Sequence, residues 1–205
     1  MINKIKLNII SNRKLCENEN LEKQIEKISS AYEKKMILEN FEIVALTLRE
    51  KDLDKNEYLK LIEEIYPICQ KYKINLILHQ NYDLNLDDKY NIEGIHLSYD
   101  IFKSLNENIK AELIKKYKRI GVSVHSLEEA KEVENLGASY VVAGHIFETD
   151  CKKGLEPRGL NFIKDISSTL TIPIFAIGGI DEKNSQSVID SGAFSVCMMS
   201  SMMKY

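Results

Sequence analysis

The sequence lacks the features that mark a membrane, secreted or nucleic-acid-coating protein. Its 205 residues contain no apolar run of the roughly 18 to 20 residues that a membrane-spanning helix needs. The amino-terminal segment has neither the apolar core nor the cleavage site of a secretion signal. Lys and Arg total 28 and Asp and Glu total 31, so the net charge is −3 and there is no basic excess for nucleic acid. We therefore expect no membrane and no nucleic-acid partner.

The sequence also lacks paired cysteines and a linker between domains. Cys16, Cys69, Cys151 and Cys197 lie far apart, with no Cys-x-x-Cys pair and no zinc spacing, which predicts reduced thiols in a cytoplasmic protein. No Gly/Ser linker, Pro-rich stretch or low-complexity run divides the chain, so we expect one domain over residues 1–205. A hydrophobic fraction of 44% and a charged fraction of 29% are typical of a soluble globular protein.

Short β-branched segments alternate with longer segments of helical spacing. The predicted strands are residues 6–10, 44–49, 75–79, 94–98, 120–125, 140–144, 174–178 and 194–199. The predicted helices are near residues 21–32, 58–72, 105–117, 127–136, 160–168 and 184–191. Pro67 should kink or divide its helix, and Ser126 with Glu129 forms a capping box that Gly137 terminates.

Eight strands with mostly helical connections predict a parallel sheet of the α/β class. At this length a closed, single-domain (β/α)₈ TIM barrel is the economical arrangement, and an open doubly wound sheet is the alternative. Only residues 201–205 follow the last predicted strand, so the eighth helix should be truncated or absent. Apolar surface would then be exposed beside the first and last strands, which predicts cover by a partner subunit, as in a homodimer, or by a shifted helix.

Alternation along the strands indicates which side chains point into the barrel. Thr47 and Arg49 share the inward face of one strand, and Ser123 and His125 that of another. His125 comes at the carboxyl end, where active sites of this fold lie, and its imidazole can take and return a proton. The alternative is a residue that only caps or packs. His96 lies mid-strand and should be a buried, hydrogen-bonded structural histidine.

His79 and His145 end two other strands and could line the site or belong only to loops. A long polar loop covers residues 144–159, and its hydroxyls and ammonium groups could hold an anion or simply face solvent.

A second set of residues favours a phosphate site. Gly178 and Gly179 follow one strand, and Met199 and Ser200 end the next, so backbone N–H groups and a hydroxyl could meet an oxyanion there. The alternative is that the two glycines serve only a tight turn. Arg49 and Lys51 could hold another anionic group. The residues thus predict a barrel that binds a small phosphorylated molecule and offers a histidine for proton transfer.

Several segments together resemble the thiamine phosphate synthase superfamily over nearly the whole chain. The segments are Thr47-Leu48-Arg49-Glu50-Lys51-Asp52, Gly94-Ile95-His96-Leu97, Gly121-Val122-Ser123-Val124-His125-Ser126, Ile177-Gly178-Gly179-Ile180 and Met199-Ser200. The resemblance implies one of two activities. A thiamine phosphate synthase joins a pyrimidine diphosphate to a thiazole phosphate with Mg²⁺, whereas a thiazole tautomerase (TenI-like) aromatises a carboxylated thiazole phosphate by moving a proton.

Two segments resemble the tautomerase branch more closely. Residues 144–156 look like its loop, with His145, Glu148 and Cys151 where the synthase usually has Pro, Pro and Thr. His79-Gln80 stands where the synthase has Asn-Asp, whose carboxylate binds Mg²⁺, and Asp100 is a candidate for the other metal carboxylate. The resemblance therefore implies a tautomerase that needs no cofactor and no metal, with the Mg²⁺-dependent synthase as the alternative.

The resemblance also implies roles for individual residues. His125 would be the general acid/base, while Gly179 and Ser200 would hold the phosphate. Arg49 and Lys51 would lie near the carboxylate or the thiazole of the small phosphorylated thiazole ligand. Thr149 and Lys152 match positions that bind diphosphate in the synthase. A non-catalytic protein of the thiamine pathway that binds or regulates is the third alternative.

Overall fold

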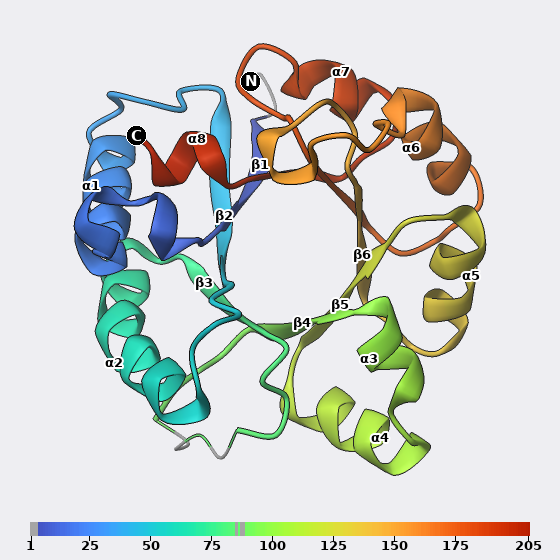
Figure 1. Cartoon of the computed structure of the whole chain (residues 1–205), viewed down its shortest axis with the longest axis horizontal. Helices are drawn as coiled ribbons and strands as arrows, with labels where there is room; N and C mark the ends of the chain where they lie inside the picture. Colours follow the sequence, from blue (N-terminus) through green and yellow to red (C-terminus); the bar gives the residue numbers. More distant parts are fainter. Residues whose placement is uncertain (1–3, 85, 87–88) are drawn as a thin grey trace.

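The computed structural model describes residues 4–84, 86 and 89–205, and in it eight parallel strands close into a barrel in chain order. The strands are β1 (Ile5–Ile10), β2 (Phe41–Leu48), β3 (Asn75–His79), β4 (Gly94–Ser98), β5 (Arg119–Val124), β6 (Tyr140–Gly144), β7 (Ile174–Ile177) and β8 (Ser195–Met198). Pairing of β1 with β8 completes the ring. Figure 1 looks down the barrel, with the helices arranged around the outside. The predicted TIM barrel is confirmed, and the open sheet is not formed.

Helices follow most of the strands. They are α1 (Leu21–Glu33), α2 (Lys55–Tyr72), α3 (Tyr99–Ser104), α4 (Glu107–Lys116), α5 (Leu127–Asn135), α6 (Gly159–Ser167), α7 (Ser185–Asp190) and α8 (Ser200–Met203). Short 3₁₀ turns η1 (Arg13–Leu15), η2 (Glu17–Glu19) and η3 (Asp150–Lys152) lie in the β1 and β6 loops. The bounds of β3, β4 and β6 match the predicted strands, while α3 was missed because one turn and a half leaves little periodicity in the sequence.

Two local predictions hold only in part. Helix α2 is not divided at Pro67, because its apolar face is buried over its whole length; it begins at a capping box of Asp54 and Glu57. In α5 the hydroxyl of Ser126 accepts the N–H of Glu129, as predicted. However, the Glu129 carboxylate accepts the backbone N–H of His125, at 2.6 Å, and not that of Ser126.

Alternate residues of the strands fill the barrel interior, as their period of two predicts. The interior cluster consists of Ile10, Ala45, Ile77, Tyr140, Val142, Phe175 and Cys197. Between β1 and β2 the polar pair Asn8 and Thr47 exchanges hydrogen bonds of 3.1 and 3.2 Å. A Cβ at Gly121 would collide with the Tyr140 ring, so the ring fits in the interior because residue 121 has no side chain. The interior is a packed core that supports a site at one end.

The eighth helix is truncated, as one of the two predicted outcomes had it, and is not absent. Helix α8 is four residues long and lies against α1 (Figure 1), with Met202 and Met203 buried. Gln24 donates to the backbone oxygen of Met202 at 2.7 Å. The short helix thus covers apolar surface that the sequence predicts to be open, and the homodimer stays a prediction that sedimentation velocity would test. No helix in the described ranges combines the length and the apolar character needed to cross a membrane.

Candidate active site

A cavity of about 930 Å³ opens at the carboxyl ends of β6, β7 and β8. Its wall includes seven of the eight residues predicted to bind the substrate or its phosphate: Arg49, Thr149, Lys152, Gly178, Gly179, Met199 and Ser200. Its floor is apolar and includes Ile10, Ile177 and Cys197. The cavity therefore combines a nonpolar bottom with polar and charged sides, as a small anionic organic ligand requires.

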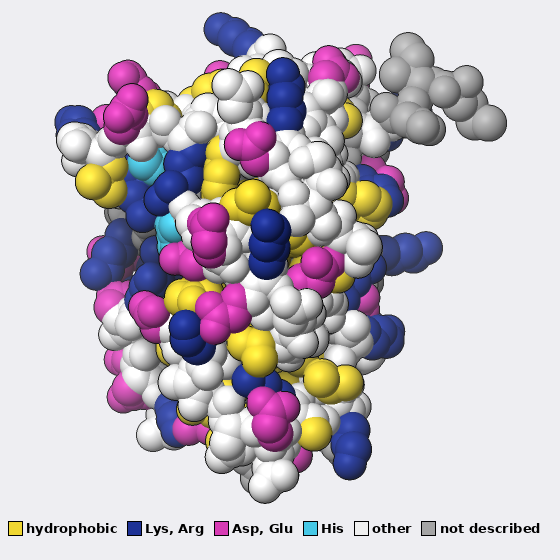
Figure 2. Space-filling model, turned by 90° about the vertical axis from the view of Figure 1, so that its right-hand side faces the viewer, with side chains coloured by type: hydrophobic (Ala, Val, Ile, Leu, Met, Phe, Trp, Pro, Cys, Tyr) yellow, Lys and Arg dark blue, Asp and Glu magenta, His cyan; other side chains and the backbone are white. Residues whose placement is uncertain are grey.

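Three cations converge on this end of the barrel. Partial burial, and after it the positive charges of Arg49 and Lys152, lower the pKa of Lys51. Lys51 is not part of the cavity wall itself, so it acts on the site through its charge. In Figure 2, Lys, Arg and His side chains gather along the left-hand edge of the molecule. A cluster of like charges close enough to shift a pKa favours an anion as the ligand.

The paired glycines form a turn that only glycine can make. Gly178 and Gly179 have φ of 107° and 64°, and a Cβ at either would collide with the β6 loop. Asn184 donates to the backbone oxygen of Gly179 at 2.9 Å and fixes the turn. Ser200 begins α8 across the cavity, and the first N–H groups of a helix have no partner within it. The tight-turn interpretation is therefore confirmed, and the anion site stays a prediction.

His125 follows β5 at the same end of the barrel but is not part of the cavity wall. Its Nδ1 lies 3.3 Å from Oε2 of Glu129 on α5, and its side chain is 45% exposed. His145, in contrast, lines the cavity, is buried, and has its Nε2 3.3 Å from the backbone oxygen of Leu155. Two imidazoles are thus present at this end of the barrel, one in the wall and one outside it.

His79 and His96 form a buried pair beneath the cations. Their rings stack with centroids 5.7 Å apart, and Nε2 of His96 lies 2.8 Å from Oγ of Ser123. Burial lowers the pKa of His79 to about 2 and that of His96 to about 3, and the positive charges of Arg49 and Lys51 act in the same direction. Both are neutral imidazoles, and the structural interpretation of His96 is confirmed.

The end of β3 does not suit a magnesium ion. His79 is held neutral in the interior, Gln80 supplies an amide, and Asp100 is an exposed residue in the first turn of α3. Within residues 4–84, 86 and 89–205, no three His, Cys, Asp or Glu side chains are grouped so as to hold a metal ion. Mg²⁺ prefers carboxylate and phosphate oxygens, and these residues do not fit it.

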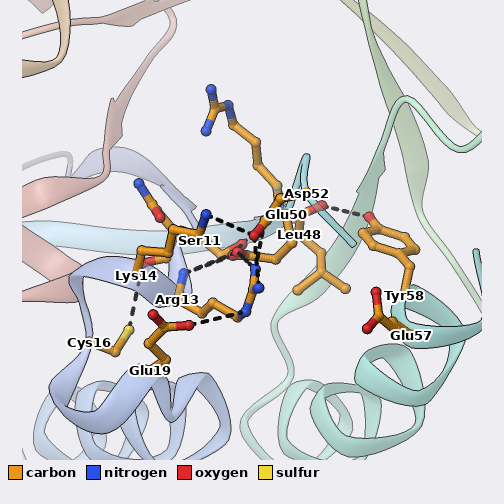
Figure 3. Close-up of polar contacts among 12 residues, drawn as sticks. Ser11, Arg13, Lys14, Cys16, Glu19, Leu48, Glu50, Asp52, Glu57 and Tyr58 are labelled. Carbon is orange, nitrogen blue, oxygen red and sulfur yellow. Dashed lines mark hydrogen bonds and ion pairs between the residues drawn. The ribbon is translucent and has the colours of Figure 1, made fainter. Parts of the chain in front are cut away.

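Sequence reasoning missed one part of the site, the support beneath Arg49. Glu50 is buried and binds Ser11 and Arg13 where β1 and β2 end (Figure 3). The signal was present, because Ser11 is the first polar residue after an apolar strand and Glu50 separates two basic residues. Neither residue type suggests a buried network by itself.

Comparison with known proteins gives relatives along the whole chain. A synthase from Clostridium tetani named "Thiamine-phosphate synthase" is 35% identical over 156 residues, 76% of this chain and 72% of that protein. One of the same name from Clostridium acetobutylicum is 32% identical over 199 residues, 97% and 87% of the two chains.

Solved structures agree on the architecture. "Thiamine phosphate pyrophosphorylase" from Pyrococcus furiosus superposes with a TM-score of 0.78 at 25% identity, covering 99% of this chain and 89% of its own. An N-acetylmannosamine-6-phosphate 2-epimerase from Clostridium perfringens, 15% identical with a TM-score of 0.67 and coverage of 99% and 90%, shares the fold alone. The family described as thiamine monophosphate synthase (TMP-TENI) matches residues 7–202, and the chain belongs to that family.

Proposed function

We propose that this chain is an enzyme of thiamine biosynthesis that aromatises a carboxylated thiazole phosphate, a thiazole tautomerase. The observation that carries the choice within the family is the end of β3, where His79 and Gln80 supply no carboxylate for a magnesium ion. An isomerisation by proton transfer needs no metal. The cavity supports the choice of substrate, because cations and a glycine turn offer places for a carboxylate and a phosphate.

In this proposal the chain binds the substrate at both of its charged ends. Gly178, Gly179 and Ser200 hold the phosphate through backbone N–H groups and a hydroxyl. Arg49 takes the carboxylate, and Lys51 adds its charge from beside the wall. The ring then lies over the apolar floor near Ile177 and Met199.

His125 moves the proton. A general base needs a ring nitrogen with a free lone pair, and a hydrogen on Nδ1, which lies 3.3 Å from the accepting carboxylate of Glu129, would leave Nε2 for that role. Nε2 removes a proton from the ring carbon, the electron pair shifts through the ring, and the same proton is returned to the exocyclic alkene carbon. The substrate gains aromaticity and no atom is lost. The imidazole must first turn from Glu129 toward the cavity, a motion open to a half-exposed side chain.

Thiamine-phosphate synthase is the second candidate, and the names of the relatives favour it. Thr149 and Lys152 line the cavity at positions that the resemblance assigns to diphosphate. Against it, Glu148 adds a negative charge to the same wall. Formation of thiamine phosphate from the pyrimidine diphosphate and thiazole phosphate with added Mg²⁺ would establish this candidate.

The deciding experiment follows aromatisation by absorbance without metal. We expect turnover by the parent chain and a loss of about 10²- to 10⁴-fold in kcat for His125→Asn, the usual contribution of a general acid/base. His145→Asn is the matched control, since it removes the other imidazole of the site. A loss of kcat in His145→Asn alone would assign the proton transfer to His145 in place of His125. No turnover by the parent chain would refute the tautomerase.

A further inference from the structure

Glu50 is a buried carboxylate that does not line the cavity but follows directly on a residue of its wall. Its side chain is 2% exposed, although its neighbours in the chain are Arg49 in the cavity wall and the exposed Lys51. A carboxylate is costly to bury unless hydrogen bonds and an opposite charge compensate it. The contacts of Glu50 therefore indicate what the burial achieves.

Those contacts join the ends of β1 and β2 (Figure 3). Ser11 Oγ donates to Oε1 of Glu50 at 2.7 Å, and the backbone N–H of Arg13 donates to its two oxygens at 3.0 and 3.1 Å. The Arg13 guanidinium lies 3.2 Å from Oε2 and also binds Asp52 at 2.7 and 2.9 Å. The buried charge is thus paired and hydrogen-bonded.

Ser11 extends this network to the cavity wall. Its hydroxyl accepts the backbone N–H of Arg49 at 2.7 Å, and its own N–H donates to the oxygen of Thr47 at 3.0 Å. A hydroxyl has one hydrogen, and the Glu50 carboxylate, which only accepts, takes it. The lone pairs of Ser11 are then directed at the N–H of Arg49.

We infer that Glu50 is a positioning residue that acts through Ser11 on the main chain of Arg49 and so fixes where the guanidinium meets the substrate. The inference rests on the proposed function, in which Arg49 takes the carboxylate of the ligand. With Gln at position 50 the amide can donate as well as accept, and it no longer neutralises Arg13. Ser11 then loses its fixed orientation, and Arg49 loses its anchor.

The test compares two aromatic ligands by calorimetry, thiazole phosphate with and without the ring carboxylate. We expect Glu50→Gln to weaken binding of the carboxylated ligand about tenfold, the equivalent of about 1.4 kcal/mol, and to leave binding of the other ligand nearly unchanged. Ser11→Ala should show the same selectivity and serves if Glu50→Gln does not fold. A purely structural role would weaken both ligands alike and would overturn the inference.

Two further variants separate the inference from the function it rests on. Asp52→Asn is the matched control, because it breaks the exposed contact to Arg13 and leaves the link from Glu50 through Ser11 to Arg49 in place. It should bind both ligands as the parent does. Arg49→Gln should lose the carboxylated ligand selectively. If it does so while Glu50→Gln and Ser11→Ala do not, the inference fails alone. If Arg49→Gln shows no selectivity, the proposed placement of the carboxylate fails with it.

Discussion

At the scale of single residues, the two interior histidines show how a polar group survives inside the barrel. Nε2 of His96 is hydrogen-bonded to the hydroxyl of Ser123, and the His96 ring stacks on that of His79. Neither imidazole can take up a proton near neutral pH, because burial and the nearby cations oppose the charge. They provide shape and hydrogen bonds beneath the site without adding to its positive charge.

This pair predicts a loss of stability in mild acid. Both folded-state pKa values lie below the ordinary value of 6.5, so the stabilisation is complete above about pH 6.5 and is lost as the pH falls toward them. From pH 7 to pH 5 we expect the free energy of unfolding to decrease by about 2 kcal/mol for each histidine. Urea denaturation across this range measures the decrease. His79→Gln and His96→Asn should each remove about half of it, and a slope that both variants leave unchanged would contradict the assignment.

Single residues also show where prediction from sequence stops. Strand alternation places Arg49 and Ser123 correctly, since facing depends only on a period of two. It cannot place His125, because a residue just past a strand end is oriented by its contacts, here Glu129. Lys51 likewise lies past the end of its strand, so alternation along the strand does not fix where its side chain points.

At the scale of elements, the strands were predictable and the ends of helices less so. Buried parallel strands are continuous apolar runs, which is why β3, β4 and β6 are recovered to the residue. The continuity of α2 through Pro67 could not be predicted, because burial of its apolar face outweighs the missing hydrogen bond. The four residues of α8 are too few for any periodic signal.

Helix α8 is short, yet we expect it to contribute substantially to stability. Met203 is 1% exposed, and its sulfur lies 3.8 Å from Sγ of Cys16. Met203→Ala should lower the free energy of unfolding by about 2 to 4 kcal/mol, through lost burial and the remaining cavity. Chemical denaturation measures the loss, and Lys204→Ala, an exposed neighbour, is the control. A loss below about 1 kcal/mol would mean that α8 is not packed as described.

At the scale of the whole molecule, alternation of strands and helices was enough to predict the barrel. The alternatives were a closed barrel and an open doubly wound sheet, and the length of the chain favoured the barrel, which is the arrangement observed. The cavity could not be predicted as a volume, because its wall comes from β1, β7 and β8 and from the segments after β2, β6, β7 and β8. Only the folded chain brings Arg49 within reach of a loop one hundred residues later.

The three cations at the barrel mouth have a consequence for how fast a ligand arrives. The chain as a whole carries a net charge of −3, yet Arg49, Lys51 and Lys152 are close enough to affect one another. Such a local field attracts an anion from solution before contact is made. We expect the association rate constant of thiazole phosphate to fall about tenfold between low and high ionic strength, as screening shortens the reach of the field. Stopped-flow mixing would measure it, with the uncharged thiazole alcohol as control. If the association rate constants of both ligands depended equally on salt, the three cations would not steer the anion to the cavity.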